Sequence, residues 1–302
     1  MAAMNTPPEL RGVLRLDEPM SKHTSWRVGG TADHYYEPAD IDDLANYLRQ
    51  LPDKEPVTMV GLGSNLLVRD RGIRGSVICP TGMLGGFEIL DAKTLRVEAG
   101  VPCAIVAKRC AKQGFTGLEF LAGIPGTVGG ALAMNAGAFG GETWPNIEKV
   151  ETLDRQGEFH LRDRDQYLIG YRSVLGPVDA HEGEWFVAAH FKLETGDGEA
   201  SLQKIKQLLA KRSESQPMGL PSCGSVFRNP EGDYAARLIE ATGLKGFQIG
   251  DAQVSEKHAN FIINLGNATA TDIEQLILLI ADRVKQQHGI QLESEVRIVG
   301  DD

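Results

Sequence analysis

The feature of this sequence that most limits its fold is a glycine-rich stretch at residues 117–142, GLEFLAGIPGTVGGALAMNAGAFGGE. Seven glycines stand among the nineteen residues from Gly123 to Gly141. A globular core does not need so many, because glycine loses more backbone freedom on folding than any other residue. The stretch therefore predicts a place where another group comes so close to the backbone that side chains are left out.

Composition and charge narrow the classes of partner. The chain has 302 residues, of which 42% are hydrophobic and 24% charged, as in an ordinary globular protein of one large domain or two to three smaller ones. A formal charge of −10 argues against nucleic acid or an anionic membrane as the partner. Anionic small molecules stay open, because arginines and backbone amides can bind phosphate locally.

The cellular setting is predicted from what the chain lacks. Its first twenty residues have no apolar run of the kind a secretory signal needs, and no later window resembles a membrane span. The four cysteines form no C-x-x-C pair and no metal-ligand spacing. We therefore expect a cytoplasmic protein with reduced cysteines and no metal, and we leave its oligomeric state open, with a monomer plausible.

The order of patterns predicts an α+β protein in three regions. Strand and helix alternate over residues 21–80 after an N-terminal extension of residues 1–20; short strands, among them LRVEAG, VETLD and WFVAAHFKLE, dominate 81–195; and helices dominate 196–302. The expected helices are IDDLANYLRQL capped by Asp40, VPCAIVAKRCAKQG closed by Gly114, SLQKIKQLLAKRSE from Ser201, YAARLIEATG, and DIEQLILLIADRVKQQH with a Thr271–Glu274 capping box and a closing Gly289. The end of the chain, LESEVRIVG, alternates like a strand, with Glu293, Glu295 and Arg297 on one face.

An earlier glycine loop, GLGSNL at residues 61–66, follows a predicted strand and is called the first loop below; the loop within the glycine-rich stretch, at residues 123–137, is called the second. The first loop fails the dinucleotide fingerprint because Leu66 stands where the third glycine belongs, and no acidic residue ends a strand about twenty residues later. The chain also lacks the glycine-lysine-hydroxyl triplet of nucleoside triphosphatases. A Rossmann site and a P-loop are therefore not expected.

The two loops together predict a large ligand. GLGSN offers consecutive backbone amides, a hydroxyl and a carboxamide, which suit pyrophosphate oxygens. The second loop adds amides, Thr127 and Asn135, and flat glycine surfaces that can admit a planar ring; a Cβ branch at Gly126 or Gly129 would fill space that such a ligand needs. For either loop alone, a tight turn in a glycine-tolerant fold is an equal alternative, but the pair favours a ligand carrying phosphates and rings.

Seven blocks of the chain, in order, resemble the UDP-N-acetylenolpyruvoylglucosamine reductase family. They are TSWRVGG, GLGSNLLVRD, the glycine-rich stretch, GYR, PSCGSVFRNP, GLKG with VSEKHANFIIN, and ESEVRIVG, and they cover nearly the whole chain from about residue 20. The family belongs to the vanillyl-alcohol oxidase type of flavoprotein. The resemblance implies a two-lobed FAD-binding unit, residues 21–80 and 81–195, and an α+β substrate-binding domain at 196–302.

The same resemblance implies a reaction of peptidoglycan precursor synthesis. NADPH would reduce FAD, and a UDP-sugar would then take the hydride at C3 of its enolpyruvyl ether, giving UDP-N-acetylmuramate. Negative charge would develop at C2 and spread into the carboxylate, which calls for cationic or hydrogen-bonding groups and a proton donor.

Site residues follow from the matching positions. Catalysis is assigned to Arg172, Ser225 and Glu295, and substrate binding to Tyr171, Asn229 and Arg297. FAD is placed against both loops, at Gly61, Gly63, Ser64, Asn65, Leu66 and Leu67 in the first and at Gly123, Ile124, Pro125, Gly126, Thr127, Gly129, Gly130, Asn135 and Gly137 in the second. Because neither loop contains histidine or cysteine, we expect the flavin to be bound without a covalent link.

Two departures from the family pattern matter. The family often has Tyr-Arg-x-Ser, whereas here Ser173 directly follows Arg172, so Ser173 is not carried over. The interval from Arg172 to Ser225 is short and resembles the subgroup that lacks an extra loop closing a tyrosine over the substrate. How the site closes is therefore left open.

Two alternatives compete with this reading. One is another non-covalent FAD oxidoreductase of the same superfamily, such as an alcohol oxidase. The other is a nucleotide-binding regulator that has lost catalysis. The presence of Arg172, Ser225 and Glu295 argues against it. Oxidation of NADPH that depends on the enolpyruvyl substrate separates both from the reductase.

Overall fold

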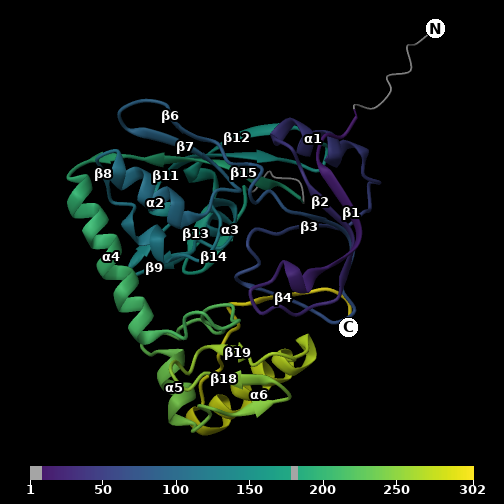
Figure 1. Ribbon diagram of the computed structural model, residues 1–302, viewed down its shortest axis with the longest axis vertical. Helices are drawn as coiled ribbons and strands as arrows, with labels where there is room; N and C mark the ends of the chain where they lie inside the picture. Colours follow the sequence, from purple (N-terminus) through teal and green to yellow (C-terminus); the bar gives the residue numbers. More distant parts are fainter. Residues whose placement is uncertain (1–8, 178–182) are drawn as a thin grey trace. The chain divides into compact units, whose positions relative to one another are not determined.

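The computed structural model describes residues 9–177 and 183–302, which form two compact units (Figure 1). Unit 1 holds the described residues up to Arg15, together with those of His34–Gly61 and Gly75–Leu208. Unit 2 holds Leu16–Asp33, Leu62–Arg74 and Leu209–Asp302. In the predicted N-terminal extension, residues 1–8 lie outside the described residues, and the remainder includes strand β1 (Val13–Pro19).

Helices form where capping residues and apolar spacing predicted them. Over the described residues they are α1 Ile41–Gln50, α2 Cys103–Lys112, α3 Val128–Ala133, α4 Gly198–Ser215, α5 Ala235–Ala241 and α6 Ala270–His288. Asp40 caps α1 by accepting a 2.9 Å bond from the amide of Asp43, and Gly114, with φ of 78°, follows the end of α2. The predictions for α1, α2 and α5 are confirmed.

The main sheet of unit 1 has five antiparallel strands in the order β12-β11-β15-β7-β6. These strands are β6 Phe87–Ile89, β7 Thr94–Glu98, β11 Ile147–Leu153, β12 Phe159–Asp163 and β15 Trp185–Lys192. The three runs predicted as strands become β7, β11 and β15. Helix α3, which ends the second glycine loop, packs against β15 and β7, so the sheet supports this loop.

The remaining strands form small sheets. A four-stranded sheet has the order β1-β2-β5-β3, with β2 Thr31–Glu37, β3 Val57–Met59 and β5 Ile73–Ile78. Two-stranded ladders in unit 1 pair β9 Gly137–Ala138 with β10 Gly141–Glu142, β13 Leu168–Gly170 with β14 Ser173–Leu175, and β8 Phe115–Thr116 with β16 Glu194–Thr195. Unit 2 contains the antiparallel sheet β17 Gln248–Ile249, β18 Ala252–Val254 and β19 Ile262–Asn264, and the parallel pair β4 Leu66–Val68 with β20 Arg297–Val299.

A charged network crosses three neighbouring strands of the main sheet. Arg96 on β7 donates to both carboxylate oxygens of Glu151 on β11, at 2.7 and 2.6 Å, and His190 on β15 lies 2.7 Å from the same carboxylate. Burial by itself would raise the pKa of Glu151, but the bonds from His190 and Arg96 outweigh it and lower that pKa from 4.5 to about 2. Glu151 is therefore ionised at neutral pH although it is only 5% exposed.

This network predicts an acid-dependent loss of stability. Because the pKa of Glu151 is lower in the folded than in the unfolded chain, its stabilising contribution is complete above pH 4.5 and is lost as pH falls towards about 2. Urea unfolding at several pH values should show a smaller acid-dependent loss for Glu151→Gln than for the natural chain within this window. Glu88→Gln, on exposed β6, should follow the natural chain, and equal slopes for all three would contradict the assignment.

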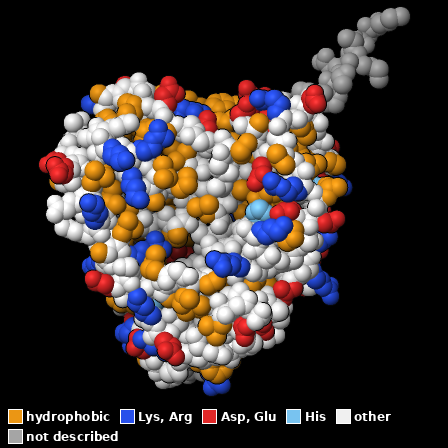
Figure 2. All heavy atoms as spheres, viewed as in Figure 1, with side chains coloured by type: hydrophobic (Ala, Val, Ile, Leu, Met, Phe, Trp, Pro, Cys, Tyr) orange, Lys and Arg blue, Asp and Glu red, His pale blue; other side chains and the backbone are white. Residues whose placement is uncertain are grey.

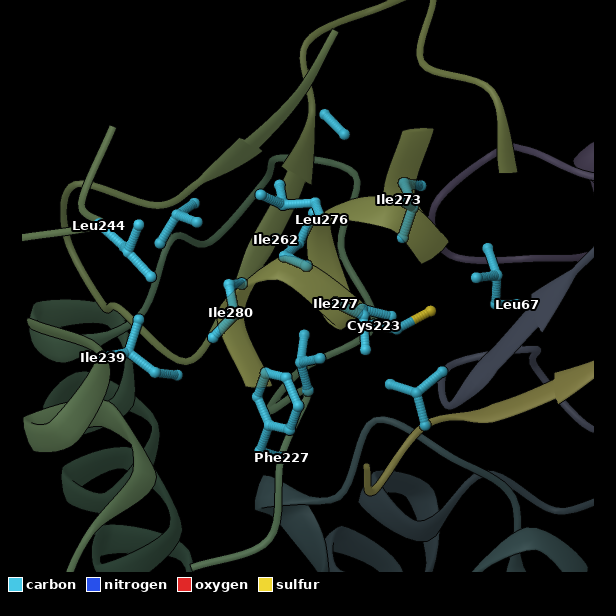
Figure 3. Packing of buried hydrophobic residues seen from close by; sticks show 14 of the residues in the cluster. Leu67, Cys223, Phe227, Ile239, Leu244, Ile262, Ile273, Leu276, Ile277 and Ile280 are labelled. Atoms are coloured by element: carbon cyan, nitrogen blue, oxygen red, sulfur yellow. The ribbon is translucent and has the colours of Figure 1, made fainter. Parts of the chain in front are cut away.

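The core of unit 2 is built on one face of α6 (Figure 3). Ile273, Leu276, Ile277, Ile280 and Val284 are all buried, which confirms the predicted apolar stripe. Three further members of this core flank predicted site segments: Leu67 ends the first glycine loop, and Cys223 and Phe227 stand on either side of Ser225. The core thus fixes the backbone on which these site residues stand.

Two helix starts were predicted too late. Helix α4 begins at Gly198 rather than Ser201, because the Asp197 carboxylate accepts bonds from the amides of Glu199 (2.9 Å) and Ala200 (3.1 Å). Helix α6 begins at Ala270 with a capping box of Thr269 and Asp272. Thr271 and Glu274, which were expected to form the capping box, make other interactions. Thr271 donates its hydroxyl to Asp70, and Glu274 pairs with Arg69, so both residues tie α6 to the segment after β4.

The predicted terminal strand is shorter than expected. Only Arg297–Val299 is a strand, and Ser294 makes an isolated bridge with Phe227. The burial pattern nevertheless holds in part: Leu292 and Val296 are buried, whereas Glu293 and Arg297 are exposed. The backbone leaves regular pairing before Arg297 because its earlier bonds go to the loop of Ser225.

Surface and membrane features are simple. Lys, Arg, Asp and Glu side chains are interspersed over the face seen in Figure 2, so the formal charge of −10 is not concentrated in one acidic area there. Over residues 9–177 and 183–302, none of the helices combines the length and apolar character needed to span a bilayer.

All four cysteines are buried and unpaired, as predicted for reduced thiols.

Candidate active site

The second glycine loop runs from a 3-10 turn, Glu119–Gly123, into α3. Thr127 caps α3 by accepting a 3.3 Å bond from the amide of Gly130, and its side chain is almost fully buried. The backbone amide of Cys103 donates to the carbonyl of Gly126 at 2.9 Å, and that of Val128 to the carbonyl of Val101 at 2.9 Å. These bonds hold the loop rigidly against the start of α2.

Several glycines of this loop make room for the protein itself. A Cβ on Gly123 would collide with the ring of Phe139, one on Gly141 would lie 2.5 Å from Phe120, and one on Gly129 would lie 2.9 Å from the Cβ of Ala99. Our expectation that side chains are excluded to leave space for a ligand is therefore wrong for these three residues. Internal close packing accounts for their lack of a side chain.

Other parts of the two loops fit the predicted FAD. Gly130 is exposed, and a Cβ there would have its nearest neighbour, Thr127 Oγ1, at 3.7 Å. Among the described residues, the backbone N–H groups of Gly126, Thr127, Gly63 and Ser64 have no protein acceptor. Such unpaired amides suit phosphate oxygens.

The first residue of the first loop lies beside the second loop within unit 1. A Cβ on Gly61 would lie 2.6 Å from Thr127 Oγ1, so the first loop begins directly against the second. The residues of each loop, taken separately, therefore fit a ligand that carries phosphate groups.

The contrast between Gly129 and Gly130 gives a test. Gly129→Ala should lower the thermal unfolding midpoint, because its Cβ would be forced against Ala99, a clash of the kind that costs about 1–3 kcal/mol. Gly130→Val should keep the stability of the flavin-free protein close to normal but reduce flavin content. Thermal unfolding of flavin-free protein and flavin absorbance of the purified variants measure the two effects. Full flavin content in Gly130→Val would contradict the placement of FAD at this loop.

Arg172 lies in the tight turn between β13 and β14, in left-handed backbone with φ of 52°. Its Nη1 donates to the carbonyl of Asn135 at 3.3 Å, and its Nη2 to that of Gly137 at 3.1 Å. Its guanidinium carbon also stands 5.0 Å from the centre of the Tyr171 ring. The structure thus brings the predicted catalytic arginine against the second glycine loop.

The first glycine loop is held by unit 2 from Leu62 onward. Gly63 has a φ of 60°, and a Cβ there would collide with the carbonyl of His23, so only glycine fits. Asn65 donates its side-chain Nδ2 to the carbonyl of Glu295 at 2.9 Å, and its own carbonyl accepts from the amide of Arg297 at 3.1 Å. Leu66 then pairs in parallel with Arg297, so the loop and β20 form one backbone network.

Ser225 and Glu295 stand on neighbouring backbone segments of unit 2. The amide of Glu295 donates to the carbonyl of Val226 at 2.8 Å, and Asn260 brackets Phe227 with bonds of 2.9 and 2.8 Å. Both Ser225 and Glu295 are half-buried. The structure thus brings these two predicted catalytic residues together, while Arg172 belongs to unit 1.

Other residues near these segments have protein roles. Asn229 is exposed and accepts a 3.1 Å bond from the amide of Ala235, where α5 begins. The Cys223 thiol donates to the carbonyls of Gly63 and Leu66, and burial raises its pKa to about 12, which keeps it a neutral thiol. Within the described residues, His, Cys, Asp and Glu form no group of three or more that could hold a metal.

Comparisons with known proteins show which family the chain belongs to. The family model described as FAD binding domain matches residues 32–161, and the C-terminal domain of UDP-N-acetylenolpyruvoylglucosamine reductase matches residues 216–299. The chain is 56% identical over 300 residues to the UDP-N-acetylenolpyruvoylglucosamine reductase of Methylococcus capsulatus, covering 99% of this chain and 97% of that one. This chain belongs to the UDP-N-acetylenolpyruvoylglucosamine reductase family.

Two further members of the reductase family support the assignment. The chain is 55% identical over 290 residues to the reductase of Alkalilimnicola ehrlichii, with 96% of each chain covered. It matches the crystal structure of the Thermus caldophilus reductase with a TM-score of 0.80 and 32% identity, over 96% of this chain and 99% of that one. The predicted fold class, an FAD-binding unit of the vanillyl-alcohol oxidase type followed by a C-terminal α+β domain, is confirmed.

Sequence reasoning missed two residues that support the site. Asn260 lies inside the block VSEKHANFIIN, so the resemblance marked its neighbourhood but not its bonds to Phe227. Glu142 ends the glycine-rich stretch, so the resemblance marked its neighbourhood too, but only the folded loop shows that its carboxylate accepts a bond from Asn135.

Proposed function

We propose that this chain catalyses the NADPH-dependent reduction of the enolpyruvyl ether of UDP-N-acetylglucosamine-enolpyruvate to UDP-N-acetylmuramate. The observation that carries the proposal is the role of Asn65. This residue of the first glycine loop bonds both Glu295 and Arg297 and so joins the loop assigned to FAD to the segment assigned to catalysis. Membership of the reductase family supports the same reaction.

FAD, when bound, supplies the hydride chemistry between NADPH and the substrate. The backbone of the two glycine loops would hold it, with amides such as those of Gly126 and Ser64 available to its phosphates. Arg172 and Glu295 would interact with the substrate carboxylate, where negative charge develops, and Arg297, Asn229 and Tyr171 would contribute to substrate binding.

Ser225 would deliver the proton to C2. A serine hydroxyl is a weak acid, so it needs a neighbouring group that returns the proton to it. Glu295 is the nearest candidate by backbone, since its amide bonds the residue after Ser225. Ser222 lies in the same loop and is the rival donor.

The setting of the reaction completes the proposal. The product is a peptidoglycan precursor, so the enzyme would serve cell-wall synthesis in the cytoplasm, without nucleic acid or membrane as a partner. Residues 21–80 and 81–195 would form the two lobes of the FAD-binding unit, and residues 196–302 the substrate-binding domain. The family models at 32–161 and 216–299 support an FAD-binding unit followed by a separate C-terminal domain.

The two half-reactions test this function separately. Under anaerobic conditions, NADPH should bleach the flavin absorbance of the purified protein, and the UDP-sugar should then restore it. Bleaching without recovery would favour another flavin oxidoreductase. Absence of both changes in flavin-loaded protein would favour a regulator without catalysis.

A further inference from the structure

The carboxamide of Asn135 joins three segments of unit 1. Its Nδ2 donates to Glu142 Oε2 at 2.9 Å and to the carbonyl of Gly170 at 3.1 Å, and its Oδ1 accepts from the amide of Trp144 at 3.1 Å. Asn135 is fully buried. Both side-chain N–H groups are therefore used inside the protein, and they connect the second glycine loop to the hairpin of Arg172.

The backbone of Asn135 is equally committed. Its carbonyl accepts from Arg172 Nη1, and the carbonyl of Gly137 accepts from Arg172 Nη2. Asn135 and Arg172 both have left-handed backbone, with φ of 45° and 52°. Such conformations in residues other than glycine persist only where the surroundings impose them, and they concentrate at functional sites.

Glu142, on strand β10, is the acceptor for the Asn135 carboxamide and is itself held in place by its backbone. It pairs with Gly137 in the β9–β10 ladder, and its backbone carbonyl accepts a 2.8 Å bond from Asn146. Gly137, Arg172 and Glu142 are tightly packed. A Cβ on Gly137 would lie 3.1 Å from Arg172 Nη1 and 3.3 Å from Glu142 Cγ. The Glu142 carboxylate is thus held where it can orient Asn135.

We propose that Glu142 and Asn135 are positioning residues that act through Arg172. Glu142 orients the Asn135 carboxamide, which fixes the left-handed turn, and that turn presents the carbonyls of Asn135 and Gly137 to the guanidinium. Two bonds from separate nitrogens set the plane of the guanidinium as well as its place. The inference rests on the proposed function, because Arg172 is assigned to the substrate carboxylate there.

A double-mutant cycle on flavin reoxidation by the UDP-sugar tests the coupling. Glu142→Ala should slow this step about tenfold, the scale of one lost buried hydrogen bond, and leave flavin reduction by NADPH nearly unchanged. Glu142→Gln should stay within about twofold of the natural chain, since its carbonyl oxygen can accept the same bond. In an Arg172→Ala background, Glu142→Ala should have no further effect.

The kinetic cycle can contradict the proposal in two ways. Independent losses that multiply in the double variant would show that Glu142 does not act through Arg172. Equal slowing of both half-reactions would show a merely structural role. Glu88→Ala, an exposed glutamate of the same unit, is the matched control and should leave both rates unchanged.

A second measurement does not depend on turnover. NMR of flavin-free protein labelled with ¹⁵N-arginine follows the side-chain signal of Arg172, which is assigned by its loss in Arg172→Lys. In the natural chain and in Glu142→Gln, this signal should lie away from the position of a solvated arginine. In Glu142→Ala it should move to the position of a solvated arginine. An unchanged Arg172 signal in Glu142→Ala would overturn the inference. If the natural chain fails to reduce the UDP-sugar, the proposed function fails, and this signal still decides whether Glu142 positions Arg172.

Discussion

Ser225→Ala is expected to leave flavin content and the NADPH half-reaction nearly intact while slowing reduction of the UDP-sugar about a hundredfold or more. Hydride delivery and protonation are separate demands, and only protonation needs a donor at C2. The change removes one hydroxyl but leaves the backbone bonds of the loop, such as that from Glu295 to Val226, in place. Stopped-flow measurement of both half-reactions gives the two rates.

Two further serine variants sharpen this result. Ser225→Cys should retain part of the activity, because a thiol can also donate a proton. Ser222→Ala removes a hydroxyl from the same loop and should behave like the natural chain. In heavy water the product should carry deuterium at C2. Near-normal substrate reduction by Ser225→Ala would contradict the assignment and point to Ser222 or to a water held by Glu295.

The second large effect is expected at the charged residues. Arg172→Lys and Glu295→Gln should each slow flavin reoxidation by the UDP-sugar about a hundredfold, corresponding to about 3 kcal/mol, with much less effect on flavin reduction by NADPH. Lysine keeps the positive charge at position 172 but lacks the planar fork that bonds the carbonyls of Asn135 and Gly137. The same stopped-flow comparison measures both effects.

A neighbouring glutamate provides the control for position 295. Glu293 is exposed and lies 3.8 Å from Arg228, so Glu293→Gln changes the charge two residues away without touching the assigned group. It should leave both half-reactions unchanged. Equal damage to both half-reactions in Arg172→Lys or Glu295→Gln would instead indicate that these residues maintain the fold.

Patterns of local origin were predictable from the sequence. The apolar stripe of α6 was read correctly because burial follows helical spacing, and the strands β7, β11 and β15 because short apolar runs between turns have few other solutions. The start of α6 was misread because the sequence offers two adjacent hydroxyl–acid pairs. Thr269 rather than Thr271 caps the helix because the hydroxyl of Thr271 bonds Asp70, a residue distant in sequence.

The reason for the glycines was only half predictable. The sequence indicated close approach to the backbone, but not what approaches. A Cβ on Gly129 would collide with Ala99, and one on Gly123 with Phe139, so a protein neighbour excludes the side chain at each of these positions. In the same way, no spacing rule reveals that Arg172 donates to Asn135, because both depend on left-handed turns that non-glycine residues rarely adopt.

The most direct test of the proposed function is steady-state oxidation of NADPH by the purified, flavin-loaded protein with and without UDP-N-acetylglucosamine-enolpyruvate, with the product isolated. We expect rapid oxidation that requires the UDP-sugar and yields one UDP-N-acetylmuramate for each NADPH consumed. Oxidation of NADPH at the same rate without the UDP-sugar, or oxidation that leaves the enolpyruvyl ether unchanged, would contradict the account.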